Sequence, residues 1–513
     1  MNSYTRFPAM FEYFIPEIFI PIDNPFPMYT ALTTRGSTDT NQERPIFDGR
    51  FYIPNFENLY RDSQKDWFKK DLKWSIENLR YIRLFLKHLT LYLTAHAVKN
   101  QIKEIQWCIS YPPNFSRRDK YEYAQMWQNI TDELQNQTGI KHLSPNINDN
   151  QYLRSENLAL AQYFAEFEQY DLVNTTCIDI GNTVSNISIW QNNQLIHQCS
   201  LNFGKRDLFS QFITTNPTIL TKFDPNFKQS DWKNLPEDVF YQKLDVWLRL
   251  ESANWLETKR DRFVEDKDFQ GLIRLMAISV SGLYFYIGQI LSALHKEGKY
   301  TFNEITPVYI GGIGSRLLHW LAEGGEFSHN SEINSLLSSI ISEGSGFPNT
   351  EELTRISKNP QEEVACGLVL KDKKLDGLGI KEKDPIIAGE DCIIGQEQFG
   401  WQERLQLQAK SINRGDYQIP TLNQLKLFLD AFHVSLDQLG IDGIKPLERY
   451  ELKEHLDDHE PDYNEKLWRA TERELKNSLI TIEGKVENIR EEAPFIIGLK
   501  ALLKVLGKEW AGK

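Results

Sequence analysis

The stretch Cys177-Ile-Asp-Ile-Gly-Asn-Thr-Val-Ser-Asn-Ile-Ser-Ile-Trp190 decides which fold is expected for this chain of 513 residues. Its apolar and β-branched residues predict a strand, Thr176–Ile180, followed by a tight turn at Gly181. Backbone N–H groups in such a turn can bind a phosphate, whereas the carboxylate of Asp179 would need a bridging Mg²⁺ with its waters. The same letters are also typical of a plain hairpin with an Asx cap.

The residues on either side of this stretch predict further strands and helices. Asn186–Trp190 and Gln194–Cys199 are expected to form a meander of two strands, and Glu156–Phe167 a preceding helix. The run Ile105–Tyr111 predicts another strand, and helical periodicity extends from Trp67 to about Lys99. Strands that alternate with helices in this way indicate an α/β protein.

A long apolar helix is predicted over residues 270–296, just before a strand at Pro307–Ile310. Met276–Leu294 contains no charged residue and approaches the length of a transmembrane span. Polar residues interrupt it, Arg274 and Lys296 bracket it, and a helix buried on all sides in a large α/β protein gives the same pattern. We therefore predict a core helix and no membrane association.

Two further motifs follow predicted strands. Val308-Tyr-Ile-Gly-Gly-Ile-Gly-Ser-Arg-Leu-Leu318 places three glycines where a backbone can approach a flat ligand closely, although its spacing is not GxGxxG. Asn359-Pro-Gln-Glu-Glu-Val-Ala-Cys-Gly367 predicts a helix in which the small residues Ala365 and Gly367 allow close packing. Open α/β sheets bind ligands at such strand ends.

Composition narrows the class of function. With 71 acidic and 58 basic residues, the formal charge is −13, which argues against a general nucleic-acid or anionic-membrane binder. The five cysteines are far apart and predict neither a disulfide framework nor a metal knuckle. The first residues lack the pattern of a secretion signal, so a cytoplasmic protein is expected.

Four of these motifs, taken in order, resemble the actin/Hsp70 superfamily of two-lobed ATPases. Ser155–Ala161, Asp179–Gly181, Gly311–Ser315 and Glu362–Gly367 are similar to its connect 1, phosphate 2, adenosine and connect 2 motifs, over roughly residues 100–370. The resemblance implies a two-lobed actin-like (ribonuclease H-like) α/β fold. An incomplete first lobe is expected at 1–170, a second lobe at 171–370 with an insertion at about 215–268, and a mostly helical C-terminal extension at 371–513.

The resemblance also implies ATP and Mg²⁺ as cofactors. Asp179 would organise the magnesium shell through water, and Glu156 would position or polarise the attacking water. The implied nucleotide-binding residues are Gly181, Asn182 and Thr183 at the phosphates, Gly311, Gly312, Gly314 and Ser315 around the adenosine, and Arg316 near the base or ribose.

Two departures from the superfamily pattern qualify these roles. No phosphate 1 hairpin is found before residue 100; Phe47-Asp48-Gly49-Arg50 is the nearest run, so a protein partner supplying this hairpin is one expectation. Asn182, Thr183 and Asn186 replace two glycines and the second acid of phosphate 2. Lys205-Arg206-Asp207 after Gly204 likewise replaces the usual Gly-Gly-x-Asp. We expect ATP binding with weak or absent hydrolysis coupled to lobe closure, or alternatively a pseudo-ATPase scaffold.

Two other patterns compete with this interpretation. His455-Leu-Asp-Asp-His459-Glu460 has the i, i+4 spacing of helical metal ligands, but a charged helix end gives the same letters. Residues 411–439 resemble the second half of a repressor-type helix-turn-helix, which leaves a DNA-binding regulator acting through residues 398–440 as a third alternative. A helical hairpin packed on the ATPase lobe is the simpler interpretation of residues 401–450.

Overall fold

The computed structural model divides the chain into two compact units. The structure describes residues 32–33, 46–47, 68–69, 79–113, 115–148, 152–223, 244, 247–248, 251–349, 354–360, 362–370, 385–407, 411–441, 463–485 and 491–511. Unit 1 comprises residues 1–109, 117–153 and 235–249, and unit 2 comprises 110–116, 154–234 and 250–513. The three-part division expected from the sequence stays a prediction, and the runs at 14–28, 48–50 and 455–460 lie outside the described residues.

The part of unit 1 that the structure describes is built on the helices α3 (Leu79–Lys99) and α4 (Arg117–Thr138). Ile130 and Leu134 of α4 are buried in a cluster with Ile82 and Leu91 of α3. The strands of this unit are β1 (Leu32–Thr33), β2 (Ile46–Phe47), β3 (Phe68–Lys69), β4 (Glu104–Gln106) and β6 (Lys141–Leu143). The predicted start of a helix at Trp67 is wrong, because Phe68 and Lys69 pair with β1 as a strand.

Unit 2 contains a five-stranded sheet in the order β10-β9-β8-β11-β12. Its strands are β8 (Asn174–Ile180), β9 (Ser185–Gln191), β10 (Gln194–Leu201), β11 (Val308–Gly311) and β12 (Thr354–Ile356). β8, β9 and β10 form an antiparallel meander, whereas β8, β11 and β12 are parallel. In chain order this is 3-2-1-4-5 with the second strand reversed, which is compatible with the expected actin-like fold. The strands predicted at 176–199 and 307–310 are confirmed.

Two helices make the parallel crossovers. α11 (Lys267–Lys296) leads from β10 to β11, and α13 (Glu332–Ser345) leads from β11 to β12. Among the described helices, α11 is the one that is long and apolar enough to cross a membrane, and 94% of its most apolar window is buried inside the fold. The prediction of a core helix is therefore confirmed. Gly288 lets α11 approach α13 closely, since a Cβ there would come within 2.5 Å of the carbonyl oxygen of Ile341.

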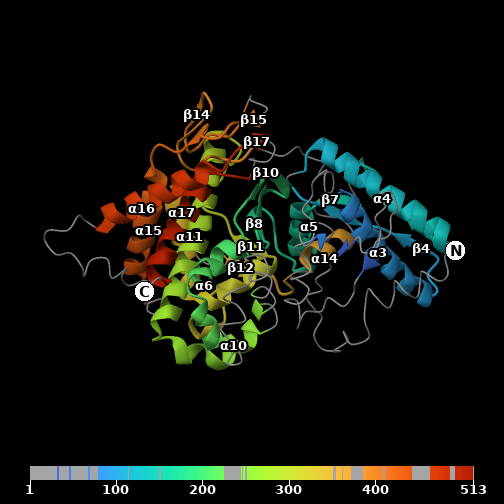
Figure 1. Ribbon diagram of the computed structural model, residues 1–513, viewed down its shortest axis with the longest axis horizontal. Coiled ribbons are helices and arrows are strands. Elements are labelled where there is room, and N and C mark those ends of the chain that lie inside the picture. Colours follow the sequence, from blue (N-terminus) through green and yellow to red (C-terminus); the bar gives the residue numbers. More distant parts are fainter. Residues whose placement is uncertain are drawn as a thin grey trace. The chain divides into compact units, whose positions relative to one another are not determined.

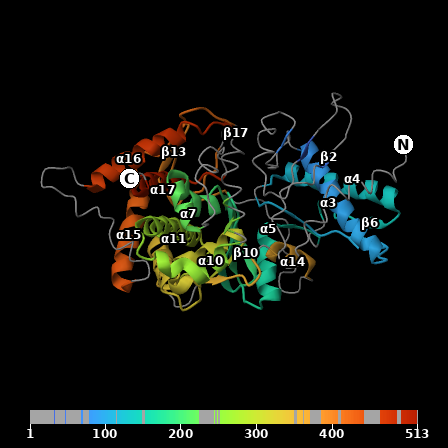
Figure 2. The ribbon, with the colours of Figure 1, turned by 60° about the horizontal axis from the view of Figure 1, so that its bottom comes forward.

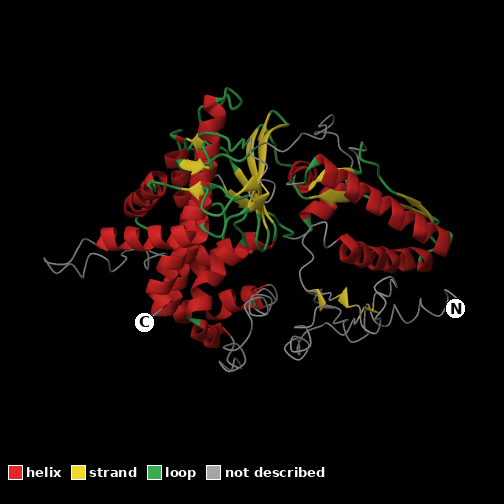
Figure 3. Cartoon of the chain, turned by 45° about the horizontal axis from the view of Figure 1, so that its top comes forward, coloured by secondary structure: helices red, strands yellow, loops and turns green. Residues whose placement is uncertain are grey.

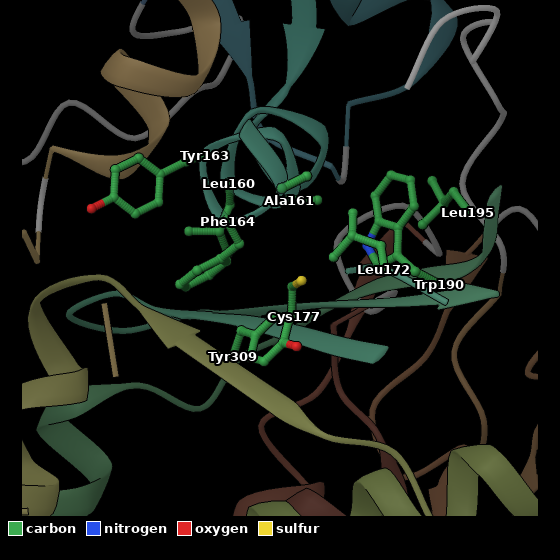
Figure 4. Packing of buried hydrophobic residues seen from close by; sticks show 10 residues of the cluster. Leu160, Ala161, Tyr163, Phe164, Leu172, Cys177, Trp190, Leu195 and Tyr309 are labelled. Carbon is green, nitrogen blue, oxygen red and sulfur yellow. The ribbon is translucent and has the colours of Figure 1, made fainter. Parts of the chain in front are cut away.

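The other face of the sheet is covered by α5 (Glu156–Gln162) and its π-helical continuation η4 (Tyr163–Phe167), with α14 (Glu363–Val369) beside them. Figures 1 and 3 show the sheet between these helices and α11. Leu160 and Phe164 point from the helical side toward Cys177 and Tyr309 of the sheet, in one buried cluster (Figure 4). Side chains alternate along a strand, so Asp179 lies on the same face as Cys177.

The C-terminal part is helical but begins with short strands. β13 (Cys392–Ile394), β14 (Glu397–Phe399) and β16 (Tyr417–Gln418) form an antiparallel sheet, and β15 (Ser411–Ile412) pairs with β17 (Gly484–Lys485). The helices α15 (Asn423–Leu439), α16 (Tyr463–Leu479) and α17 (Pro494–Ala511) gather beside α11 in Figures 1 and 2. The expected helical hairpin is therefore wrong for residues 401–441, where strands precede a single helix.

A buried carboxylate joins α15 to this small sheet. Glu390 accepts hydrogen bonds from the backbone N–H groups of Gln424, at 2.9 Å, and Leu425, at 3.0 Å. The first N–H groups of a helix have no partner within the helix, so a carboxylate at that position satisfies them and favours the helix dipole. Phe428 of α15 then packs on Phe285 of α11. The C-terminal part is thus packed against the core helix.

Shorter elements complete the described chain. They are β5 (Ile109–Tyr111), β7 (Leu153–Ser155), η5 (Arg206–Ser210), α6 (Gln211–Thr215), η6 (Pro217–Ile219), α7 (Leu220–Phe223), α10 (Ser252–Lys259), η7 (Arg260–Phe263), η8 (Ile313–Leu317), α12 (Leu318–Leu321) and η9 (Glu323–Gly325). β4 and β5 divide the single strand predicted at 105–111. The chain passes from unit 1 to unit 2 within β5 and again within β7.

Candidate functional site

Asp179 lies at the carboxyl end of β8, directly beside the end of the parallel strand β11. Its register partner on β11 is Gly311. The next residue, Gly312, has φ +77° and faces the carboxylate so closely that a Cβ would come within 2.1 Å of Oδ1. Only glycine combines this backbone conformation with this approach. Asp179 and the glycine-rich motif after β11 therefore meet at one edge of the sheet.

Glu156 joins Asp179 at this edge from the start of α5. Ser155 caps that helix, because its hydroxyl accepts a hydrogen bond from the N–H of Leu158 at 3.3 Å. The amide of Asn186 donates through Nδ2 to Glu156 Oε2 at 3.2 Å. Asn186 is also the cross-strand neighbour of Asp179 and hydrogen-bonds to that carboxylate. One amide therefore links the two candidate catalytic acids.

The orientation of Asn186 is fixed by a third partner. Ser200 on β10 donates its hydroxyl to Asn186 Oδ1 at 2.8 Å, which leaves the amide nitrogen for the two carboxyl groups. An aspartate at position 186 could not donate in this way and would add a third negative charge. In the sequence, Asn186 stands out only because it replaces an expected acid. Its bridging role depends on the pairing of β9 with β8 and β10, which brings its partners together.

Glu363, at the start of α14, is a third carboxyl group beside Asp179. It is buried, and its Oε1 accepts a hydrogen bond from the N–H of Gly312 at 3.1 Å. The negative charge of Glu363 contributes to the raised pKa of Asp179. Glu363 belongs to the motif quoted from the sequence, but nothing in its spacing indicated that it would contact the glycine turn.

The pKa values of the two half-buried acids are raised. Burial, followed by the charge of Asp179, raises the pKa of Glu156 to about 7. Burial, followed by the charge of Glu363, raises the pKa of Asp179 to about 6, and the Asn186 hydrogen bond opposes this rise. Among the described residues, neither acid is paired with a basic side chain. Such uncompensated carboxylates favour an incoming cation.

The turn at Gly181–Val184 closes the hairpin between β8 and β9. Gly181 donates its N–H to the Val184 carbonyl at 2.9 Å. The carbonyls of Gly181 and Asn182 accept hydrogen bonds from the N–H groups of Lys205, at 2.8 Å, and Arg206, at 2.9 Å. Within the part of the chain that the structure describes, the N–H groups of Asn182 and Thr183 have no partner, so this turn offers donors to an anion.

Gly204 holds the neighbouring segment against this turn. A Cβ on Gly204 would come within 2.7 Å of the backbone N and C atoms of Thr183 and the N atom of Val184. Backbone atoms cannot yield as a side chain can, so the two segments pack at this distance only because residue 204 is glycine. Gly204 precedes the residues that depart from Gly-Gly-x-Asp, and nothing in its position along the chain indicates this contact with Thr183.

The glycine-rich motif after β11 packs against β8. A Cβ on Gly314 would come within 2.2 Å of Ile180 Cγ2, and the buried Ser315 donates its hydroxyl to the carbonyl of Gly312 at 2.7 Å. Arg316 is half-buried. Burial lowers the pKa of His319, and the charge of Arg316 contributes to that lowering. Close packing on β8 therefore explains why positions 312 and 314 are glycines. Contact of this motif with an adenosine stays a prediction.

The helices α5 and α14 cross at Gly367. A Cβ there would lie 1.8 Å from the carbonyl oxygen of Ala159, so the two helices touch backbone to backbone. The expectation of close packing is confirmed for Gly367 and is wrong for Ala365, which is exposed. This crossing fixes Glu156 and Glu363, each in the first turn of its helix, on either side of the strand end.

The donors of this site suit a hydrated cation held by a single carboxylate. Among the described residues, no group of three or more His, Cys, Asp or Glu side chains is arranged to hold a metal ion directly. Asp179 is half-buried and lacks a basic partner, so it can bind a cation through water, with the remaining ligands coming from another molecule. The residues present therefore fit Mg²⁺ that arrives with a phosphate.

Comparison with solved structures adds a distant similarity. No protein family model and no curated protein matches the chain. Among solved structures, the ethanolamine utilization protein EutJ from Carboxydothermus hydrogenoformans is similar over 60% of this chain and 80% of that chain, with 12% identity and a TM-score of 0.29. At this TM-score the similarity supports no assignment of site or activity. The fold itself is mixed α/β with a helical C-terminal part.

Proposed function

We propose that the protein binds ATP with Mg²⁺ as an actin/Hsp70-like protein and that its hydrolysis of ATP is weak or absent. The observation that carries this proposal is that a group able to bind a cation and groups able to bind an anion lie in one hairpin. Asp179 offers an uncompensated carboxylate to a cation, and the adjacent turn offers the N–H groups of Asn182 and Thr183 to an anion. A metal–phosphate complex satisfies both.

Each residue then has a distinct role. Asp179 would hold hydrated Mg²⁺, and Asn182 and Thr183 would donate backbone hydrogen bonds to the terminal phosphates. When bound, Mg²⁺ would neutralise phosphate charge and orient the phosphate chain. Glu156, with its pKa raised to about 7, can accept a proton from a water near neutral pH, and Asn186 fixes the direction of its carboxylate.

Slow turnover is favoured by the residues that differ from the superfamily pattern. Asn186 is an amide and cannot take a proton, so it can orient a water but cannot act as a second base. Asn182 and Thr183 carry side chains where the pattern has glycines, which restricts how the turn can wrap a phosphate. Phosphoryl transfer depends on positioning, so these differences favour binding over hydrolysis.

Calorimetric titration of the full chain with ATP, with and without Mg²⁺, tests this proposal. We expect Mg²⁺-dependent binding that Asp179→Asn weakens at least roughly tenfold, because the isosteric amide cannot anchor the hydrated cation. Asp171→Asn, which removes an exposed carboxylate outside the site, should bind as the wild type does. Binding that is absent, or that is equal in the wild type and Asp179→Asn, would overturn the proposal.

A pseudo-ATPase scaffold is the second candidate, and the Asn186 amide is the observation that favours it. Phosphate release measured on the nucleotide-saturated protein separates the two. Slow release that is lost in Glu156→Gln supports a weak ATPase, whereas tight binding with no release supports a scaffold. A protein partner that carries a phosphate 1 hairpin would add ligands for Mg²⁺. Its addition should therefore raise the affinity for nucleotide or the rate of phosphate release.

A further inference from the structure

The C-terminal helix α17 reaches the segment that supports the candidate phosphate turn. Lys500 of α17 donates from Nζ to the carbonyl of Asn202 at 2.7 Å. The same ammonium group lies 3.5 Å from Asp207 Oδ1 and forms an ion pair with it. Asn202 and Asp207 are the two ends of the segment that leads from β10 into η5. Lys500 therefore fastens both ends of this segment.

This segment holds the Gly181–Val184 turn in place. Asp207 Oδ2 accepts a hydrogen bond from the N–H of Gly204 at 3.0 Å, which fixes the point where Gly204 packs on Thr183. The two residues between them, Lys205 and Arg206, donate their N–H groups to the carbonyls of that turn. An unbroken chain of contacts thus runs from the ammonium of Lys500 to the turn with the free donors.

A second set of contacts comes from the residues just before α17. The carbonyl of Glu491 accepts from the N–H of Asn202 at 3.0 Å, and Glu492 Oε1 accepts from Asn202 Nδ2 at 2.6 Å. Tyr417 of β16 donates its hydroxyl to the carbonyl of Glu492 at 2.8 Å. The start of α17 is therefore fixed to the small C-terminal sheet as well as to Asn202.

Lys500 is also the cation that the acids of this region share. Burial raises the pKa of Asp207 and of Glu492, and in both cases the charge of Lys500 opposes the rise. Removing this charge would leave both carboxyl groups with less compensation. The two other lysines on this side of α17, Lys504 and Lys508, pair instead with Glu474 of α16.

We infer that Lys500 is a positioning residue for the candidate nucleotide site, and that α17 thereby sets the conformation of the Gly181–Val184 turn from the C-terminal part of the chain. The expected effect on phosphate binding rests on the proposed function. The contacts that join Lys500 to the turn do not depend on any ligand. It assigns a role to residues that lie outside the motifs of the ATPase resemblance.

Amide hydrogen exchange on the nucleotide-free full chain tests the link directly. The N–H groups of Lys205 and Arg206 are donors in it, so their exchange reports whether the turn is held. In Lys500→Met we expect these amides to exchange at least roughly tenfold faster, because a charge-assisted hydrogen bond and an ion pair are lost together. Lys504→Met removes the same charge from the same helix and should leave them unchanged. Lys500→Arg should restore most of the protection.

Titration with Mg²⁺ and ATP then tests the consequence. We expect Lys500→Met to bind at least roughly tenfold more weakly than Lys504→Met, since an unheld turn must be ordered on binding. Unchanged exchange at Lys205 and Arg206 in Lys500→Met, with wild-type thermal stability, would overturn the inference. Faster exchange in a protein whose wild type binds no nucleotide would instead refute the proposed function and keep the structural link. Faster exchange with unchanged nucleotide affinity would refute the positioning role.

Discussion

Gly312 packs against the carboxylate of Asp179, and this contact joins the ends of β11 and β8 at the candidate site. The glycine has φ +77°, and a Cβ would lie 2.1 Å from Oδ1. The carboxylate therefore occupies the space that any side chain at position 312 would need. Because β8 and β11 are parallel neighbours, this single contact brings the Asp179–Gly181 segment and the glycine-rich motif after β11 together.

Gly312→Ala should consequently lower the free energy of unfolding by more than alanine usually does at a position with left-handed backbone. We expect a loss of about 3 kcal/mol or more in the free energy of unfolding, measured by urea denaturation. Gly324→Ala is the matched control, because Gly324 has φ +70° with no atom within 4 Å of its Cβ position. It should cost only about 1 kcal/mol. Equal losses in the two variants would contradict the contact with Asp179.

Stability of the ligand-free protein should fall as the pH rises from about 4.5 to about 7. The pKa of Glu156 is raised from its ordinary value of 4.5 to about 7, so in this window the folded state keeps a proton that the unfolded state has released. Glu156→Gln should flatten the decline by no more than about 1.4 kcal/mol per pH unit. Urea midpoints at several pH values check this, with the exposed Glu472→Gln as control. A slope that Glu156→Gln leaves unchanged would exclude Glu156 as its source.

Asn186→Asp should destabilise the ligand-free protein, and more at pH 8 than at pH 5. The new carboxylate would face Glu156 and Asp179 without donating to either, and the repulsion grows as all three groups ionise. We expect a loss of roughly 1–3 kcal/mol at pH 8 in urea denaturation. Asn186→Ala also removes the hydrogen bonds but adds no charge, so its loss should depend less on pH. The same pH dependence in both variants would count against a charge effect.

Helical glycines of this protein should respond to alanine in opposite directions. Gly367→Ala forces a Cβ to within 1.8 Å of the Ala159 carbonyl oxygen, which must separate α5 from α14 and cost about 2 kcal/mol or more. Gly507→Ala in α17 meets its nearest atom at an ordinary 3.6 Å, so it should stabilise the protein by up to about 1 kcal/mol. Thermal melting of both variants measures the signs. Stabilisation by Gly367→Ala would mean that the helices do not cross there.

Several parts of the fold were predictable because the signal lies in neighbouring residues. The strands Thr176–Ile180 and Asn186–Trp190 follow from the alternation of β-branched residues. The core helix over 270–296 follows from a long apolar run in which polar residues argue against a membrane span. The meeting of Asp179 with Gly312 follows from one further rule, that parallel strands end at the same edge of a sheet. Errors occurred at Phe68–Lys69 and over 401–418, where short runs have no period and their pairing partners decide the conformation.

The sequence by itself determined the order of strands and helices and which acid follows which strand, because backbone preference and hydrophobic alternation act over a few residues. Only the tertiary structure decided that Asn186 links Glu156 to Asp179, that Gly204 lies on Thr183, and that Lys500 reaches Asn202 from a helix 298 residues away. These contacts join residues on different elements, and their energies depend on distance and burial in space. No spacing along the chain encodes such distances, so they exist only once the sheet and its helices have packed.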